Sequence, residues 1–253
     1  MGIGESVKKG FSVATQSMAL VFCLFAFGVF WSILNLLYTS KFQTPAQAPS
    51  PIVIALAVVF ILLSIYMQAG SLGFVLNKIK QGNADLSSFA AAAGKFYLRV
   101  LLLGLFVAVI AGAFILLAGL GVAFLQTPGM VIAVVLGGIG IYVLLLMFLS
   151  PYILVAEDNK VIASIKKSVA FVRKNILAVL GISLILVAIG FAAGVILGLV
   201  YGAITLVLKA GTASQIIFAV LSSFLNAFLG VFVTAGFMNY YLANSNNTGG
   251  AGA

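Results

Sequence analysis

Apolar segments of about 20 residues recur along this 253-residue chain and limit its possible folds more than any other feature. A helix of that length crosses the roughly 30 Å hydrocarbon core of a membrane. A soluble domain of this size has too little interior to bury the hydrophobic residues, which make up 64% of the sequence. The sequence therefore predicts an all-α, polytopic membrane protein with six transmembrane helices, at about 18–39, 52–74, 97–122, 130–155, 176–202 and 215–241.

Basic residues lie mostly on one side of these predicted spans. Eleven of the thirteen precede span one or fall between spans two and three or between spans four and five, whereas Lys41 and Lys209 lie on the other side. Cytoplasmic loops of membrane proteins are enriched in Lys and Arg. We therefore expect a multi-pass protein of the cell (cytoplasmic) membrane with its N-terminus and C-terminus in the cytoplasm. Residues 243–253 are predicted to form a flexible cytoplasmic tail.

The segment 161–175 is predicted to be an amphipathic helix at the membrane surface. At 100° per residue its aliphatic residues form one narrow stripe, which consists of Val161, Ile162, Ile165, Val169 and Val172. A basic arc lies on the opposite side of the helix. Such a helix places its apolar face in the acyl boundary and its lysines among the headgroups. We expect the net charge of +9 to serve anionic lipids rather than nucleic acid. Headgroup contact is predicted for Lys8, Lys9, Lys166, Lys167, Arg173 and Lys174.

The chain also repeats itself. A shift of 158 residues aligns Ser6-Val7-Lys8-Lys9 with Ser164-Ile165-Lys166-Lys167, and half that shift aligns Lys95 with Lys174. Any helix that enters a membrane tends to be basic and amphipathic, which explains the charges but not the even spacing. The pattern predicts one transmembrane domain, 1–242, built from three hairpin units that are each preceded by an amphipathic interfacial helix. Their approximate bounds are 6–84, 85–163 and 164–242.

Several short motifs resemble a known family. They are Ser150-Pro151-Tyr152, Val155-Ala156-Glu157, Ser164, Ser168 and Val172-Arg173-Lys174-Asn175, together with Gln68-Ala69-Gly70, Gly73 and Lys95-Phe96-Tyr97-Leu98-Arg99. The chain resembles the membrane domain found beside bacterial glycerophosphodiester phosphodiesterases, and related stand-alone six-helix membrane proteins of bacteria and archaea. In that family the hydrolytic chemistry belongs to an attached soluble domain, which we do not expect here. The resemblance therefore implies an architecture and no activity.

Residues suited to catalysis are scarce. The chain has no histidine, one cysteine (Cys23) and four carboxylates, all at the predicted cytoplasmic border: Glu5, Asp85, Glu157 and Asp158. Histidine-based triads and metal clusters cannot be assembled from this set, so we expect no catalytic residue, no metal site and no cofactor. Glu157 and Asp158 are predicted to cap the helix that begins near Val161. A membrane enzyme would instead use these two carboxylates for acid–base chemistry.

Polar residues within the spans leave transport as an alternative. Tyr142 and Asn226 form a candidate mid-membrane polar site, while neutral groups such as Ser222 and Ser223 usually hydrogen-bond between helices. No span has an ionisable residue in its central portion, where ion-coupled carriers usually keep one. We expect a non-catalytic scaffold, accessory subunit or lipid-interacting protein. The alternative is a transporter or channel for a neutral or amphipathic solute.

A glycine stripe marks the fifth span. Gly190, Gly194, Gly198 and Gly202 lie on nearly one face, which predicts close packing of another helix, either within the chain or from a second subunit. The expected partners are membrane lipids, anionic on the cytoplasmic side, and a protein partner or self-association remains open. Pro151 is predicted to kink or end the fourth span near the cytoplasm.

Overall fold

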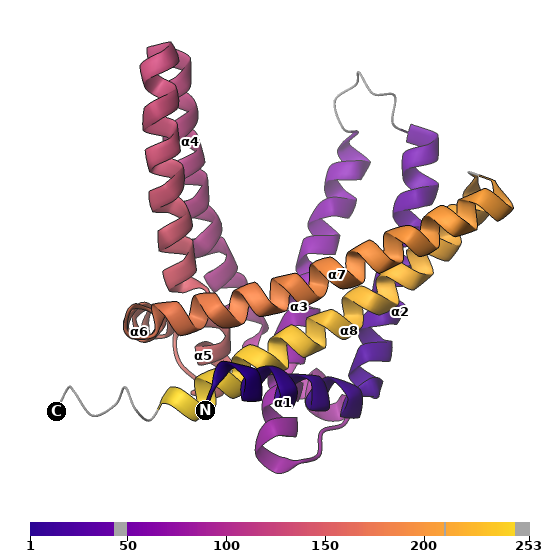
Figure 1. Cartoon of the computed structure of the whole chain (residues 1–253), viewed down its shortest axis with the longest axis horizontal. Helices are drawn as coiled ribbons and strands as arrows, with labels where there is room; N and C mark the ends of the chain where they lie inside the picture. The colour runs from indigo at the N-terminus through magenta and orange to yellow at the C-terminus, as the bar shows by residue number, and fades with distance from the viewer. Residues whose placement is uncertain (43–49, 210, 246–253) are drawn as a thin grey trace.

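The computed structural model describes residues 1–42, 50–209 and 211–245, and in these residues the chain forms helices and no strand (Figure 1). In chain order the helices are α1 (Ile3–Gln16), α2 (Met18–Phe42), α3 (Pro51–Gln81), α4 (Leu86–Met147), α5 (Ser150–Ala156), α6 (Val161–Lys174), α7 (Ile176–Leu208) and α8 (Thr212–Asn244). Among the described residues, five helical segments are long and apolar enough to cross a membrane. The all-helical prediction is confirmed, and the five segments indicate a multi-pass membrane protein.

The longest helix, α4, contains the third predicted span and most of the fourth, and it doubles back on itself (Figure 1). Gln126 has φ 49° and ψ −120°, which no α-helical residue adopts. A Cβ added to Gly129 would lie only 1.9 Å from the carbonyl oxygen of Gly121, so glycine is required where the two arms meet. By length and composition there are therefore five apolar helices in the described chain rather than the six predicted, because α4 carries two arms.

The helix ends follow local signals in the sequence. Asp85 caps α4 by accepting a hydrogen bond from the Ser88 N–H at 2.9 Å. The C-cap of α3 is Gly82, whose φ of 76° belongs to the left-handed region that glycine favours. α4 ends at Met147, and α5 begins at Ser150 with Pro151 in its first turn. The predicted break at Pro151 is thus confirmed.

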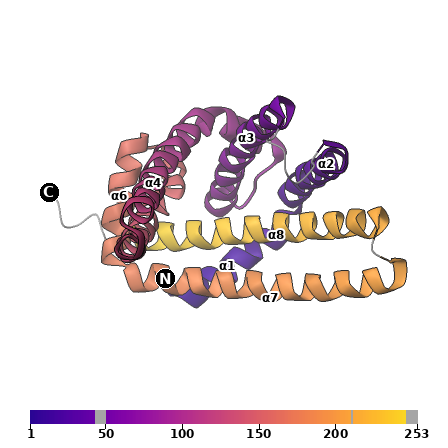
Figure 2. The same cartoon turned by 90° about the horizontal axis from the view of Figure 1, so that it is seen from above.

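Buried residues gather at one end of the molecule, which we call the base. It comprises α1, α5, α6 and the adjoining parts of α3, α4, α7 and α8. Beyond it the two arms of α4 stand apart from the other long helices, whereas α2 packs on α8 through Phe25 and Phe224 before the outer ends of these helices diverge (Figures 1 and 2). We call these outer parts the arms. Between Leu103 and Leu146 of α4 only Gly129 and Gly140 are buried, and in α7 no residue after Leu186 is buried.

The short helices α1 and α6 dock on the bundle through stripes of small residues. The buried residues of α1 are Ser6, Gly10 and Ala14, and those of α6 are Ser164, Ser168, Phe171 and Val172. Gly10 faces α8 so closely that an added Cβ would lie 2.8 Å from the Gly236 nitrogen. Ser168 Oγ donates a 2.7 Å hydrogen bond to the carbonyl of Leu146 in α4.

The packing of α6 differs from the prediction of a helix whose apolar stripe faces only lipid. Ile162 is 63% exposed, as a lipid-facing residue would be, but Val161, Ile165 and Val169 pack partly against the core, and Val172 is fully buried. The helical period predicted the basic arc correctly but gave no sign that the serines face protein. A buried serine is tolerated here because its hydroxyl bonds a backbone carbonyl.

The first turns of α4 dock on α3 in a similar way. Added Cβ atoms would lie 2.5 Å from the Phe89 ring at Gly70 and 2.1 Å from the Ala92 Cβ at Gly73. However, residues 86–95 do not form a separate interfacial helix as predicted, because α4 continues through Phe96 without a break. α1 and α6 instead end at Ser17 and Asn175, with similar φ/ψ of −110°/36° and −121°/27°. Ser and Asn favour such breaks, whereas Phe has no side-chain group that competes for backbone hydrogen bonds.

The predicted tail begins later than expected. Ala243 and Asn244 belong to the last turn of α8, and the Asn244 side chain accepts a hydrogen bond from the N-terminal amine of Met1 at 3.4 Å. Residues 246–253 lie outside the described residues.

Candidate functional site

A charged pocket of about 640 Å³ opens at the base between the end of α3, the start of α4 and the loop after α5. Its polar lining residues are Asn77, Lys80, Ser88, Lys95, Glu157 and Asp158. The last turns of α3, the first three turns of α4 and the loop after α5 supply them, so they sit where the long helices leave the apolar part of the molecule.

Asp158 links this loop to α4. Its carboxylate accepts from Lys95 Nζ at 2.8 Å and from Arg99 Nη1 at 2.6 Å. These hydrogen bonds and positive charges hold the pKa of Asp158 below its usual value. Lys95 and Arg99 also lie near the face of the Phe96 ring, at 5.0 and 6.0 Å from its centroid. Asp158 is therefore ionised and held in place at neutral pH.

Glu157 links the same loop to α6 and α8. Its carboxylate accepts hydrogen bonds from Lys167 of α6, from the Tyr241 hydroxyl of α8 and, at 2.9 Å, from the Asn159 amide. Partial burial raises the pKa of Glu157, but the hydrogen bonds from these three side chains and the charge of Lys167 outweigh it, so the pKa is lowered. Together, Glu157 and Asp158 connect α4, α6 and α8 through one turn of chain.

The prediction that these carboxylates cap α6 is wrong. The N-cap of α6 is Lys160, and no side chain caps it. Asp158 has a φ of 53°, a left-handed conformation, while both carboxylates engage cations and a hydroxyl of other helices. In the folded protein the two carboxylates bind side chains of α4, α6 and α8 instead of the backbone N–H groups at the start of α6.

The charged pocket has an excess of positive charge. Lys95 and Arg99 both pair with Asp158, and Lys167 pairs with Glu157. With Lys80, four cations therefore surround these two carboxylates. Lys80 Nζ itself contacts the carbonyl oxygen of Ala156 at 3.4 Å. The arrangement is suited to binding an anionic group at the surface of the base.

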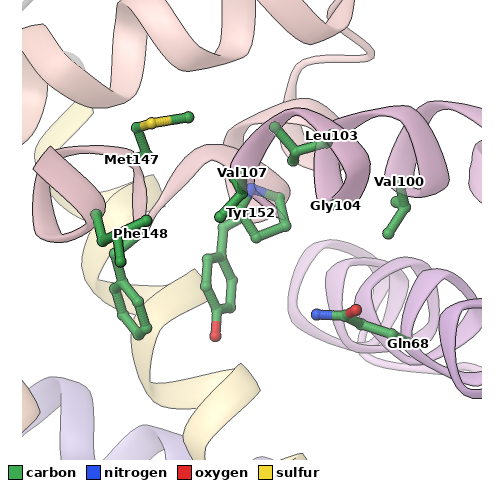
Figure 3. A pocket seen from close by; sticks show the side chains of 10 residues that line it. Gln68, Val100, Leu103, Gly104, Val107, Met147, Phe148 and Tyr152 are labelled. Atoms are coloured by element: carbon green, nitrogen blue, oxygen red, sulfur yellow. The ribbon is translucent and has the colours of Figure 1, made fainter. Parts of the chain in front are cut away.

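A second pocket, of about 410 Å³, lies deeper along the same helices (Figure 3). Val100, Leu103 and Val107 of α4 and Phe148 make its lining mostly apolar, and Gly104 leaves room along α4. Its polar groups are the amide of Gln68 from α3 and the hydroxyl of Tyr152 from α5. Tyr152 is 8% exposed, and neither polar group has a hydrogen-bond partner within the described residues. We call this the apolar pocket.

The two pockets adjoin. Phe96 lines the charged pocket and Val100 the apolar one, and they lie one turn apart on α4. Tyr152 and Val155 are related in the same way on α5. The two pockets therefore lie next to each other along α4 and α5, and we call them together the groove.

The six basic residues predicted to contact headgroups, Lys8, Lys9, Lys166, Lys167, Arg173 and Lys174, are all exposed. Two of them also pair within the chain: Lys9 with Glu5 at 3.0 Å, and Lys167 with Glu157. α1 and α6 thus present basic side chains to the surroundings while their small residues face the bundle.

Tyr142 and Asn226, the candidate mid-membrane site, lie on α4 and α8 and are both exposed, Tyr142 by 45%. Neither lines the charged or the apolar pocket. Ser223 does bridge helices as predicted, since its Oγ lies 3.4 Å from that of Ser32 in α2. Ser222 bonds its own helix at the carbonyl of Ala219.

The glycine stripe of α7 faces away from the described chain. A Cβ added at Gly190, Gly194, Gly198 or Gly202 would meet no described atom within 4 Å, apart from those of its own helix's backbone. Close packing at these positions is therefore not made by any helix of the described chain.

Sequence reasoning missed the groove itself. Gln68 and Tyr152 stand in the motifs that carried the family resemblance, which was the available signal. No signal in the sequence indicated the pairing of Lys95 with Asp158, because the two residues are far apart in sequence and come together only through the α4 hairpin. Within the described residues, no group of three or more His, Cys, Asp or Glu side chains gathers that could hold a metal ion.

Comparison with protein families gives one result. Residues 1–243 match a family described as a domain of unknown function, DUF7847. The chain belongs to this family. The DUF7847 match shows no link to the membrane domain of glycerophosphodiester phosphodiesterases, so that resemblance stays a hypothesis. Neither a curated protein nor a solved structure matches the chain.

Proposed function

We propose that this DUF7847 protein is a six-pass membrane protein made of three related units, with both termini in the cytoplasm. The two arms of α4 count as separate passes, since the chain reverses at Gln126 between them. The basic residues of the base then face the cytoplasm, as the distribution of Lys and Arg favours. The base would form the cytoplasmic end and the arms the membrane and its outer side.

Matching bounds and matching contacts support the three-unit interpretation. α1 and α6 begin at residues 3 and 161 and end at 16 and 174, which is the 158-residue shift found in the sequence. Gly10, Phe89 and Ser168 are spaced by 79 residues, and they contact α8, α3 and the end of α4 respectively. In each case the first helix of a unit rests on the second hairpin helix of another unit, which is the pattern of a cyclic threefold repeat.

Within this architecture we propose a non-catalytic role in which the base engages anionic lipids, as a scaffold, an accessory subunit or a lipid-interacting protein. The observation that carries it is that all six basic residues of α1 and α6 are exposed while the opposite faces are docked. A basic side chain near an anionic surface contributes on the order of 1 kcal/mol. The ion-paired carboxylates Glu157 and Asp158, with lowered pKa values, are poorly suited to exchanging protons near pH 7.

The test is the lipid composition that accompanies the protein when membranes are solubilised in polymer discs. Wild type should be enriched in anionic lipid relative to the bulk membrane. Replacing Lys8, Lys9, Lys166, Lys167, Arg173 and Lys174 by Gln should remove most of that enrichment. Unchanged enrichment in a correctly folded variant would show that the basic arcs do not select lipids. Because Lys167 also binds Glu157, a variant that keeps Lys9 and Lys167 should be measured as well.

Transport of a neutral or amphipathic solute past Tyr142 and Asn226 is the alternative. Replacing these two residues by Phe and Leu should abolish transport if it occurs there. A scaffold's assembly should stay nearly unchanged, because both side chains are exposed and neither lines a described pocket.

A further inference from the structure

We propose that the groove between α3, α4 and α5 holds a single phospholipid, with its phosphate in the charged pocket and one hydrocarbon chain in the apolar pocket. This inference rests on the proposed membrane-embedded function but concerns a different site from the basic arcs of α1 and α6. Four observations carry it: the charge of the opening, the polarity of the interior, the length of the groove and its position beside lipid-facing residues.

The opening suits a phosphate. Lys80 and Lys95 line it together with the carboxylates of Glu157 and Asp158. Arg99 and Lys167 pair with these two carboxylates, so the four nearby cations outnumber the two acids. Asn77 and Ser88 add neutral hydrogen-bonding groups on either side. Phosphate oxygens accept such hydrogen bonds strongly, and more so when the donors are charged.

The apolar pocket presents two polar groups to a ligand. The Tyr152 hydroxyl is on a side chain that is only 8% exposed, and together with the Gln68 amide it faces an otherwise apolar pocket (Figure 3). Neither group bonds another described residue. The Gln68 side chain is exposed, so its amide is open to a ligand that enters the pocket beside Tyr152. The oxygens that link a glycerophosphate to its hydrocarbon chains would lie just below the phosphate and would accept from both groups.

The dimensions fit one membrane leaflet. From Lys95 to Val107 the groove follows twelve residues of α4, or roughly 18 Å at 1.5 Å per residue. One leaflet of a typical bilayer contributes roughly 15 Å of hydrocarbon. Leu102, Leu105 and Phe106 on the neighbouring face of α4 are exposed and apolar, so a chain can enter from the side.

Gly104 allows a sharp test. It lines the apolar pocket, and an added Cβ would meet no atom within 4 Å beyond its own helix's backbone. Gly104→Leu should therefore fill the pocket without straining the helix. Gly112→Leu is the matched control, because Gly112 lies two turns further along α4, has equal room and does not line the pocket.

The full-length protein is placed in detergent micelles with equimolar phosphatidylglycerol and phosphatidylcholine, and bound lipid is counted by native mass spectrometry. Wild type and Gly112→Leu should retain one phosphatidylglycerol. Gly104→Leu should retain about tenfold less, Lys80→Gln about fivefold less, and Tyr152→Phe about threefold less, since it loses only one hydrogen bond. Equal retention by Gly104→Leu and Gly112→Leu would overturn the proposal.

Two further measurements separate the groove from a soluble-anion site and from the basic arcs. Inorganic phosphate added without lipid should not stabilise the protein against heat; stabilisation equal to that by phosphatidylglycerol would assign the site to a soluble anion and refute a lipid. The variant with Gln at all six basic-arc positions should still retain the single lipid. If it loses anionic enrichment but keeps that lipid, both proposals stand. If Gly104→Leu loses the lipid and the arc variant keeps its anionic enrichment, the groove site stands and lipid selection by the basic arcs is refuted.

Discussion

The base and the arms use glycine in opposite ways. At the base, Gly10, Gly70 and Gly73 sit where an added Cβ would lie within 3 Å of a neighbouring helix. In the arm of α7, Gly194, Gly198 and their stripe have nothing within 4 Å beyond their own helix's backbone. The same residue type therefore closes one region and leaves the other open.

This difference shows where the molecule's own contacts provide its stability. The base buries Phe74, Ile153, Phe237 and their neighbours and is tied together by Glu157 and Asp158. The arms bury few residues, and apolar side chains such as Leu199 and Phe191 are over 70% exposed. In a membrane such surfaces face lipid without penalty, since lipid tails are as apolar as the side chains.

The largest effect is expected at Gly73. Gly73→Ala should lower the unfolding free energy by about 1–3 kcal/mol, because the new methyl would lie 2.1 Å from the Ala92 Cβ and neither atom can rotate away. Thermal unfolding in lipid nanodiscs measures the effect. Adding Ala92→Gly to this variant moves the methyl group to the other helix and should restore much of the loss. A double variant no more stable than Gly73→Ala would show that this contact does not set the spacing of α3 and α4.

A smaller effect is expected at Glu157. Glu157→Gln should cost about 1 kcal/mol, since it weakens the hydrogen bonds from Lys167 and Tyr241 at a site that solvent partly reaches. The same thermal unfolding measurement applies. Glu5→Gln is the control, because Glu5 pairs only within α1 at the exposed surface, and it should have little effect. Equal losses in both variants would contradict a bridging role for Glu157.

The pH dependence should follow from the same carboxylates. Their folded pKa values lie below the ordinary 4.5 of Glu and 3.8 of Asp, so the unfolded chain binds more protons in acid. The stability that they contribute is present above those values and is lost as the pH falls through the folded pKa. The difference in unfolding temperature between wild type and a Glu157→Gln, Asp158→Asn variant should therefore shrink below about pH 4.5. A constant difference from pH 7 to pH 3 would argue against these pKa shifts.

The smallest effect on stability is expected in the arm of α7. Gly194→Ala should leave the protein as stable as wild type or raise its stability by up to about 1 kcal/mol, through helix propensity alone. A loss of stability that depends on protein concentration would indicate that a second subunit packs on the stripe. Gly198→Leu, compared by native mass spectrometry of oligomers, separates these outcomes further.

Much of the fold could be predicted from local patterns. The 158-residue shift anticipated that α1 and α6 would match residue for residue, and the proline at position 151 anticipated the break before α5. The reversal of α4 was expected between 122 and 130 and lies at Gln126. The prediction of a separate interfacial helix at residues 86–95 was wrong. This segment aligns with α6 in the sequence, yet α4 continues through Phe96, whereas α1 and α6 have their C-caps at Ser17 and Asn175.

The candidate site was harder to foresee. Lys95, Lys80, Gln68, Tyr152 and Asp158 come from α3, α4 and the α5–α6 region, and no spacing along the chain connects them. Glu157 and Asp158 were noticed for their proximity to α6, but the N-cap position of that helix is Lys160 and no side chain caps it. Whether these carboxylates bind nearby backbone N–H groups or cations distant in sequence depends on which helices pack beside the loop.

By itself, the sequence determined that the chain is helical and apolar enough for a membrane, near which residues several long helices begin, and which faces of α1 and α6 are basic. Helix periodicity, capping chemistry and hydropathy act over a few residues, so they can be read along the chain. Tertiary structure alone decided which glycines are in contact, which carboxylates are bridged and where the groove runs. These depend on distances between helices that are far apart in sequence, which backbone reversals and close packing set.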